Sequence, residues 1–356
     1  MMYINSLLEE VTGRGVSDLH ITAGVPPIIR ERGFLRKFGS RALNGEDTEK
    51  ILRQLLNEDQ LKIFEEKGEV DFSYNLTGLG YFRVNGYRQR GSVGIAIRVL
   101  NTKIVTLKEL EMPDTLATMA MRNQGLILVT GPTGSGKSTT LAAMTDLINS
   151  NKENHIITLE DPIEYVHKHK KSVVTQREIG QDSNTFPAAL RAALRQDPDV
   201  ILVGEMRDLE TISIAVTAAE TGHLVLATLH TNDSAQSVER IIDSFPSNQQ
   251  HQIRTQLANS LVGIVSQRLI PRRDDSGRIA AVEVLLCNNA VRNLIREGKI
   301  HQIPSTMQIC ASQGMLTMDK CLQNLYQKGK ISKDIVLEYA RDDEAMHSFF
   351  KSSCIA

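Results

Sequence analysis

One segment of the sequence combines glycine, lysine and serine at the spacing that a phosphate-binding loop requires. Gly131 is followed after four residues by Gly136, Lys137 and Ser138, within the stretch GPTGSGKSTT. Glycine permits the positive φ angles with which backbone N–H groups close around an anion. Lysine supplies a cation to the outer phosphates, and the serine hydroxyl is a ligand for Mg²⁺. The segment predicts a site for ATP and Mg²⁺ with Ser138 as metal ligand and these loop residues: Gly131, Thr133, Gly134, Ser135, Gly136, Lys137, Ser138 and Thr139.

Acidic residues follow two other apolar runs further along the chain. Glu160 and Asp161 come directly after the run 156–159, and Glu205 comes just after the run 200–203. The carboxyl ends of parallel strands meet at one edge of a sheet, so we expect these acids beside the phosphate loop. ATP hydrolysis requires an acid near the metal and the attacking water. Each acid alone has a second interpretation, a solvated strand end, but two acids after core strands favour a hydrolase, with Glu205 as the base.

Two histidines bracket a further apolar run, 224–229. His230 lies at its carboxyl end, where the side chain could contact a γ-phosphate, and His223 lies at the opposite end. A lone histidine is more often structural, and for His223 the structural and functional interpretations stay equally open.

The elements that must position these residues fall into two patterns. The runs around the loop are short and continuously apolar, which is typical of parallel strands buried on both faces and covered by helices. The first hundred residues instead alternate apolar and polar positions between Gly-containing turns, as in an antiparallel meander, with helices expected at 4–12 and 48–66. The predicted organisation is a domain at 1–100, a linker at 101–113, an ATPase core at 114–270 and a mostly helical region at 271–356, whose clearest helices are 256–267 and 289–297.

Composition narrows the function classes. The chain has 356 residues, 41% of them hydrophobic and 23% charged, with a formal net charge of -1. This balance is typical of a globular protein and gives no overall attraction to nucleic acid or to an anionic membrane. The four cysteines are isolated, which favours neither a zinc site nor a disulfide framework. The sequence shows neither a signal peptide nor an apolar run of the ~20 residues that a membrane span needs, so we expect a cytoplasmic protein that reaches a membrane through a partner.

Four segments together resemble the secretion-type ATPase superfamily of type IV pilus and type II secretion motors. In chain order they are GPTGSGKSTT, ITLEDPIEY, DVILVGEMRD and ETGHLVLATLHTND, which match the Walker A loop, Asp box, Walker B box and His box of that superfamily. The chain is most similar to the pilus retraction branch, because it lacks an extra N-terminal domain and a tetracysteine motif. The segment 290–297, AVRNLIRE, also resembles the AIRNLIRE motif of that branch and departs from it only at Val291.

The resemblance implies a fold and roles for single residues. The fold is α/β, with an N-terminal PAS-like α+β domain followed by a RecA-like P-loop ATPase domain and a helical C-terminal region. Lys137, Ser138 and Thr139 would bind phosphate and Mg²⁺, and Glu160 and Asp161 would support the metal site. Glu205 would be the catalytic carboxylate and His230 the γ-phosphate contact.

A homohexameric ring is also implied. The P-loop domain shows no obvious arginine that could complete its own site, whereas the first domain carries several on its strands. Arg83 and Arg98 are the arginines expected to act on a neighbouring subunit's nucleotide, and Arg88 and Arg90 are expected only to flank solvated strand faces. An arginine supplied in this way can raise the rate of phosphoryl transfer by ~10³–10⁵.

The partners that follow from the resemblance are an inner-membrane pilus platform protein and, indirectly, pilin, with the ring peripheral at the inner membrane. Nucleic acid is not expected, because the only basic patch is 167–171. The alternatives are an accessory retraction ATPase, a pilus extension or type II secretion ATPase, a nucleic-acid motor and a nucleotide-gated binding protein.

Overall fold

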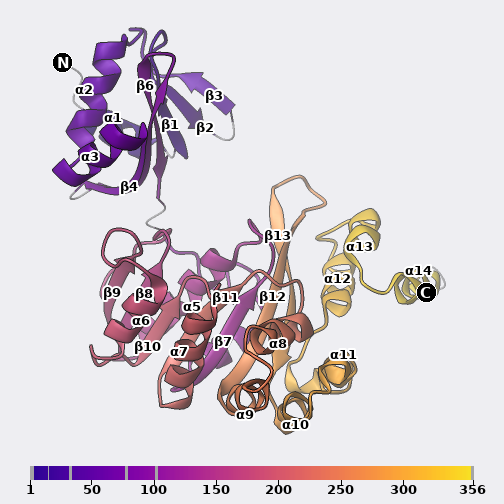
Figure 1. The fold of residues 1–356 in the computed structure, drawn as a ribbon. Coiled ribbons are helices and arrows are strands. Elements are labelled where there is room, and N and C mark those ends of the chain that lie inside the picture. Colours follow the sequence, from indigo (N-terminus) through magenta and orange to yellow (C-terminus); the bar gives the residue numbers. More distant parts are fainter. Residues whose placement is uncertain (1–3, 15, 32–33, 77–78, 101–102, 354–356) are drawn as a thin grey trace. The chain divides into compact units, whose positions relative to one another are not determined.

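The computed structural model describes residues 4–14, 16–31, 34–76, 79–100 and 103–353, and the chain divides into two compact units. The first is Met1–Lys103 together with Glu164–Val166, and the second is Ile104–Ile163 together with His167–Ala356. Each unit has its own sheet and its own buried core (Figure 1). The predicted α/β class, with an α+β unit before a P-loop unit, is confirmed.

The first unit is an antiparallel sheet with three helices. Its strand order is β3-β2-β1-β6-β5-β4, and residues of α1 and α2 pack with it around Leu19, Phe82 and Ile95. The elements are α1 (Ile4–Gly13), β1 (Asp18–Ile21), β2 (Ile28–Glu31), β3 (Phe34–Lys37), α2 (Gly45–Leu55), α3 (Glu58–Lys67), β4 (Glu69–Leu76), β5 (Gly80–Gln89) and β6 (Ser92–Val99).

The single helix predicted over 48–66 is two helices. Asn57 ends the run because its side chain accepts a hydrogen bond from Gln60 N at 2.9 Å, and Gln60 Oε1 accepts one from Asn57 N at 3.0 Å. This reciprocal capping box starts α3 afresh. The apolar spacing continues through the break, which is why periodicity alone did not reveal it.

The second unit is a seven-stranded sheet in the order β13-β12-β7-β11-β10-β8-β9. All neighbouring strands are parallel except β13, which pairs antiparallel with β12. The strands are β7 (Gly125–Thr130), β8 (His155–Glu160), β9 (Val173–Glu178), β10 (Val200–Val203), β11 (Leu224–Leu229), β12 (Leu261–Pro271) and β13 (Arg278–Leu286).

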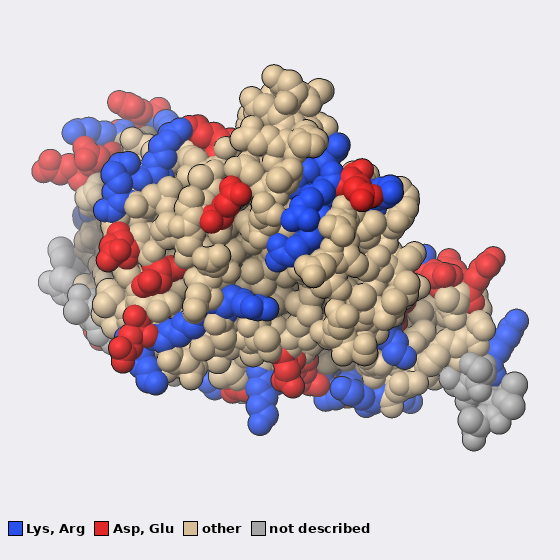
Figure 2. All heavy atoms as spheres, turned by 90° about the horizontal axis from the view of Figure 1, so that it is seen from below, with Lys and Arg blue, Asp and Glu red and all other residues tan. Residues whose placement is uncertain are grey.

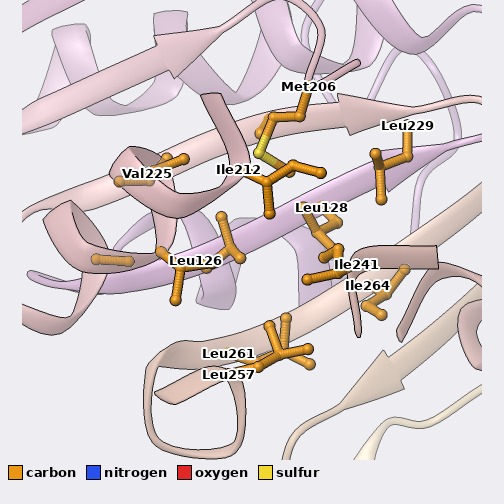
Figure 3. Packing of buried hydrophobic residues seen from close by; sticks show 14 of the residues in the cluster. Leu126, Leu128, Met206, Ile212, Val225, Leu229, Ile241, Leu257, Leu261 and Ile264 are labelled. Carbon is orange, nitrogen blue, oxygen red and sulfur yellow. The ribbon is translucent and has the colours of Figure 1, made fainter. Parts of the chain in front are cut away.

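Helices cover both faces of this sheet, as the continuously apolar strands predict. Leu126 and Leu128 point to one face, where Figure 3 shows them with Ile212 of α7, Ile241 of α8 and Leu257 of α9. Residues of α6, α10 and α11 belong to the same buried cluster. Ile127 and Val129 point to the other face, against α4, α5 and α12. The helices are α4 (Asp114–Ala120), α5 (Lys137–Asn151), α6 (Phe186–Ala193), α7 (Leu209–Glu220), α8 (Ser234–Asp243), α9 (Gln250–Ser260), α10 (Asn289–Glu297), α11 (Ile303–Ile309), α12 (Met318–Gln327), α13 (Lys333–Tyr339) and α14 (Asp343–Ser353), with 3₁₀ turns at Ile300–Gln302 and Ala311–Gln313.

Two predictions for the C-terminal part are wrong. The helix expected over 256–267 ends at Ser260, and the chain continues as β12. The predicted boundary at 270 therefore falls within a strand, and the region 271–356 contains the strand β13 as well as the helices α10 to α14. The adjacent residues Ile264 and Val265 are both fully buried, on opposite faces of the sheet. A short run that is apolar at every position fits a buried helix or a buried strand equally well by periodicity.

Part of the predicted linker is packed structure. Leu107 and Met112 are buried in the core of the second unit, whereas residues 101–102 lie outside the described part of the chain. Within the described residues, none of the helices has the length and apolar character needed to cross a membrane.

Candidate active site

The phosphate loop connects β7 to α5 at the carboxyl edge of the sheet. Gly131, Gly134 and Gly136 have φ angles of 145°, 77° and 89°, the region that favours glycine. Lys137 Nζ donates to Gly131 O at 2.8 Å and to Pro132 O at 3.0 Å. The hydroxyl of Ser135 is buried and finds no hydrogen-bond partner among the described residues. A buried hydroxyl, an ammonium group and a helix N-terminus gathered in one loop fit the phosphates of a nucleotide.

Gln267 of β12 supports this loop, and the sequence did not predict it. Its side chain is 2% exposed; Nε2 donates to Ser135 O at 2.8 Å, and Oε1 accepts from Thr140 Oγ1 at 2.7 Å. A Cβ atom at Gly136 would lie 2.8 Å from Gln267 Nε2, and one at Gly131 would collide with Gln267 O. The glycines are therefore required by this close approach as well as by their φ angles. Because 256–267 was predicted to be a helix, Gln267 was not expected beside the phosphate loop.

The strand order brings the predicted acids and His230 to the same edge. β11 lies between β7 and β10, and β8 lies beyond β10. Leu229 pairs with Thr130, and Val203 pairs with both Ala227 and Leu159. Glu160, Glu205 and His230 thus all end or follow strands at the edge where the phosphate loop begins.

Glu205 is held between a histidine and an arginine. His230 Nε2 lies 3.2 Å and Arg207 Nε 2.6 Å from Glu205 Oε1. Burial on its own would raise the pKa of Glu205, but the hydrogen bond from Arg207 and the charges of His230 and Arg207 outweigh it, so the pKa lies below its ordinary value. A carboxylate of this kind stays charged at neutral pH. Arg207 was not predicted, because an exposed arginine after a strand gives no distinctive pattern.

Gly204, immediately before Glu205, lies in close contact with the end of β8. A Cβ atom at Gly204 would lie 3.1 Å from Leu159 O and 3.2 Å from Glu160 Cα. Gly204 N also donates to Leu159 O at 2.7 Å. The small residue lets the chain after β10 pass close to the end of β8, so the segments that carry Glu160 and Glu205 are in contact.

Glu160 is oriented by hydroxyl and amide groups. Its Oε1 accepts from Thr158 Oγ1 at 2.6 Å and from Gln176 Nε2 at 3.2 Å. Asp161 is exposed, and its charge contributes to raising the pKa of Arg207, after the larger contributions of Glu205. One polar cluster at the sheet edge therefore contains Glu160, Asp161, Glu205 and Arg207. Within the described part of the chain, no group of three or more His, Cys, Asp or Glu residues could hold a metal ion on its own.

His223 lies at the opposite end of β11 and has a structural role. Its Nδ1 lies 3.0 Å from Ala218 O, and its carbonyl accepts from Gly125 N at 3.0 Å. The first contact closes the turn from α7 into β11, and the second joins the start of β11 to β7. Of the two interpretations of His223, the structure supports the structural one.

Arg83 and Arg98 are neighbours in the first unit. They are direct cross-strand partners on β5 and β6, so their side chains leave the sheet on the same face. Arg83 Nη2 lies 2.8 Å from Asp71 Oδ2, and Arg98 Nε lies 3.0 Å from Asp18 Oδ1. Burial would raise the pKa of Asp18, but the bonds from Arg98 and Ser17 lower it further than burial raises it. The two arginines form one basic pair held by acidic partners.

The arginines of the AVRNLIRE segment bind the end of another helix. Arg292 Nη1 donates to Ala258 O and, at 2.8 Å, to Asn259 O, and Arg296 Nη2 donates to Asn259 Oδ1 at 2.8 Å. These carbonyls belong to the last turn of α9, which continues directly into β12. A cation at this position also interacts favourably with the helix dipole.

Acidic and basic side chains are interspersed over the molecular face drawn in Figure 2, often next to one another, with areas of other residues between them. The fold and the polar cluster beside the phosphate loop define a P-loop ATPase. The family model "Type II/IV secretion system protein" matches residues 1–313, and the chain belongs to this family.

Similar proteins span almost the whole chain. The type IV pilus retractation ATPase PilT of Pseudomonas aeruginosa is 47% identical over 96% of this chain and 99% of its own. A twitching motility protein of Neisseria gonorrhoeae is 46% identical over 90% of this chain and 86% of its own. The crystal structure of the pilus retraction motor PilT with bound ADP matches with a TM-score of 0.89 and 49% identity, over 97% of this chain and 99% of that one.

Proposed function

We propose that this ATPase drives type IV pilus retraction as a homohexameric motor. The observation that carries the proposal is 47% identity to a named retraction ATPase over 96% of the chain. The segment AVRNLIRE, which resembles a motif of the retraction branch, supports the same assignment.

The site residues divide the chemistry of ATP hydrolysis among them. Lys137 and the loop N–H groups hold the phosphates, while Ser138, followed by Thr139, provides the hydroxyl for Mg²⁺, which when bound neutralises charge on the phosphate oxygens. Glu205 accepts the proton of the attacking water, because it is a charged carboxylate at the sheet edge. His230 would contact the γ-phosphate, and Glu160 and Asp161 would support the metal site.

A ring would complete this site with the basic pair of the first unit. Arg83 and Arg98 share one sheet face, so a neighbouring subunit could present both guanidinium groups to a nucleotide together. Within one subunit the two arginines pair with Asp71 and Asp18. A head-to-tail contact of this kind closes into a ring, in which nucleotide state controls the interface between subunits.

The motor would act at the cytoplasmic side of the inner membrane on a pilus platform protein, and through it on pilin. Nucleic acid is not among the proposed partners. An accessory retraction ATPase is the second candidate, because the type IV pilus ATPase PilU of Pseudomonas aeruginosa is 43% identical over 95% of this chain.

Deletion of the gene, with a twitching assay and a count of surface pili, tests the proposal. A retraction motor predicts loss of twitching with many surface pili, restored by the wild-type gene but not by Glu205→Gln. Loss of twitching with no surface pili would identify an extension motor instead. Intact twitching would favour the accessory role.

A further inference from the structure

Arg341 contacts the segment that follows His230, although it lies more than a hundred residues further along the chain. It occupies the turn between α13 and α14, outside the residues 1–313 that the family model matches. Its Nη2 donates to Asn232 O at 3.0 Å, and its Nη1 lies 3.7 Å from Asp233 Oδ2. Asn232 is only two residues from His230.

The same guanidinium pairs with a buried carboxylate. Glu283 of β13 is 4% exposed, and its Oε2 lies 2.9 Å from Arg341 Nη1. Its Oε1 accepts from Ser234 N at 2.9 Å and from Ser234 Oγ at 2.8 Å, at the start of α8. A buried carboxylate needs a counter-charge and full hydrogen bonding, and Arg341 provides the charge. The segment from His230 to α8 is thus fixed at both Asn232 and Ser234.

The backbone of Arg341 is fixed in turn by α12. Asp319 accepts from Arg341 N at 2.8 Å and from Asp342 N at 3.2 Å. The backbone of Arg341 and the groups that its guanidinium binds are therefore both fixed. Arg341 joins α12 to the segment after His230.

We infer that Arg341 is a positioning residue that holds His230 against Glu205 and links the C-terminal helices to the hydrolytic site. His230 Nε2 lies 3.2 Å from Glu205 Oε1, a contact that depends on where the segment 231–233 lies. The inference rests on the proposed role of His230 in hydrolysis.

A double-mutant cycle on ATP turnover tests it. Arg341→Gln should lower kcat by ~10-fold and leave KM for ATP within about twofold, because the phosphate loop is untouched. In the His230→Ala background the same substitution should change kcat by less than about twofold, because the residue through which it acts is absent. Arg53→Gln, which removes an arginine–glutamate pair from α2 in the first unit, is the matched control and should leave kcat unchanged.

Two further variants separate positioning from folding. Glu283→Gln with Arg341→Gln removes the unpaired buried charge, so its melting temperature should recover while kcat stays low. Arg341→Lys keeps a charge for Glu283 but lacks the planar fork that also reaches Asn232, so it should be as stable as wild type and only partly active.

The outcomes are distinguishable. Equal losses from Arg341→Gln with and without His230 would overturn the inference alone, as would recovery of kcat in the double variant with Glu283→Gln. Full turnover by His230→Ala would overturn the inference together with the proposed role of His230.

Discussion

His230 Nε2 lies 3.2 Å from Glu205 Oε1, across the carboxyl ends of the neighbouring strands β11 and β10. The contact joins the residue proposed to detect the γ-phosphate to the residue proposed to activate water. A change at the phosphate would therefore act directly on the carboxylate. The predictions below follow from this pair and from the residues that hold it.

Arg207→Ala should move the acid limb of the kcat profile to higher pH. Glu205 must be deprotonated to accept a proton, and its pKa is low because, although burial raises it, the bond from Arg207 and the charges of His230 and Arg207 lower it more. Without Arg207 the pKa rises, so activity is lost at a higher pH as the solution is acidified. Turnover measured from about pH 4 to 8 would show the shift. Arg195→Ala, also exposed, is the control, and a profile unchanged by Arg207→Ala would contradict the account.

Gln267→Leu should weaken ATP binding by ~10-fold, because Ser135 O and Thr140 Oγ1 lose their buried partner and the loop loses its support. Binding of a fluorescent ATP analogue measures the effect directly. Gln327→Leu, on the exposed end of α12, is the matched control and should bind normally. Wild-type affinity in Gln267→Leu would show that the loop keeps its shape unaided.

Arg83→Ala should be inactive alone and partly active in mixed rings with Glu205→Gln subunits. In a mixed ring the wild-type Arg83 of a Glu205→Gln subunit can serve the intact Glu205 site of its neighbour. ATPase activity measured across mixing ratios would show a maximum at intermediate ratios. Arg88→Ala, whose guanidinium lies 5.0 Å from the Phe64 ring centre, is the control and should be active alone. Strictly additive activity at every ratio would argue against action between subunits.

Arg292→Ala should lower the free energy of unfolding of the second unit by ~1–3 kcal/mol, because carbonyls at the end of α9 lose a charged donor. Chemical denaturation followed by circular dichroism measures it. Glu297→Ala, which removes only an exposed pair with Lys299, should have little effect. Equal stability of the two variants would remove the proposed structural role of Arg292.

The sequence alone is sufficient to predict the parts of the fold that depend on residues close together in the chain. The phosphate loop is predicted from glycine spacing, and the apolar runs at 156–159, 200–203 and 224–229 correspond to β8, β10 and β11. Glu160, Glu205 and His230 were expected at one sheet edge, and the strand order places them there. Their catalytic roles stay predictions.

What the sequence did not reveal depends on contacts between distant segments. Gln267 supports the loop from a strand that periodicity had assigned to a helix. Arg341 and Glu283 meet only because β13 and the turn after α13 come together in the fold. Neither the contact of Gln267 with the loop nor the pair of Arg341 and Glu283 follows a recognisable spacing in the sequence, so only the packed structure could identify them.

ATP turnover by Glu205→Gln tests the central claim most directly. The substitution keeps the shape of the side chain and removes its ability to accept a proton. Measured together with binding of a fluorescent ATP analogue, it should show wild-type affinity and a fall in kcat of at least ~10²-fold. Turnover close to that of the wild type, with binding intact, would contradict the assignment of Glu205 as the hydrolytic base.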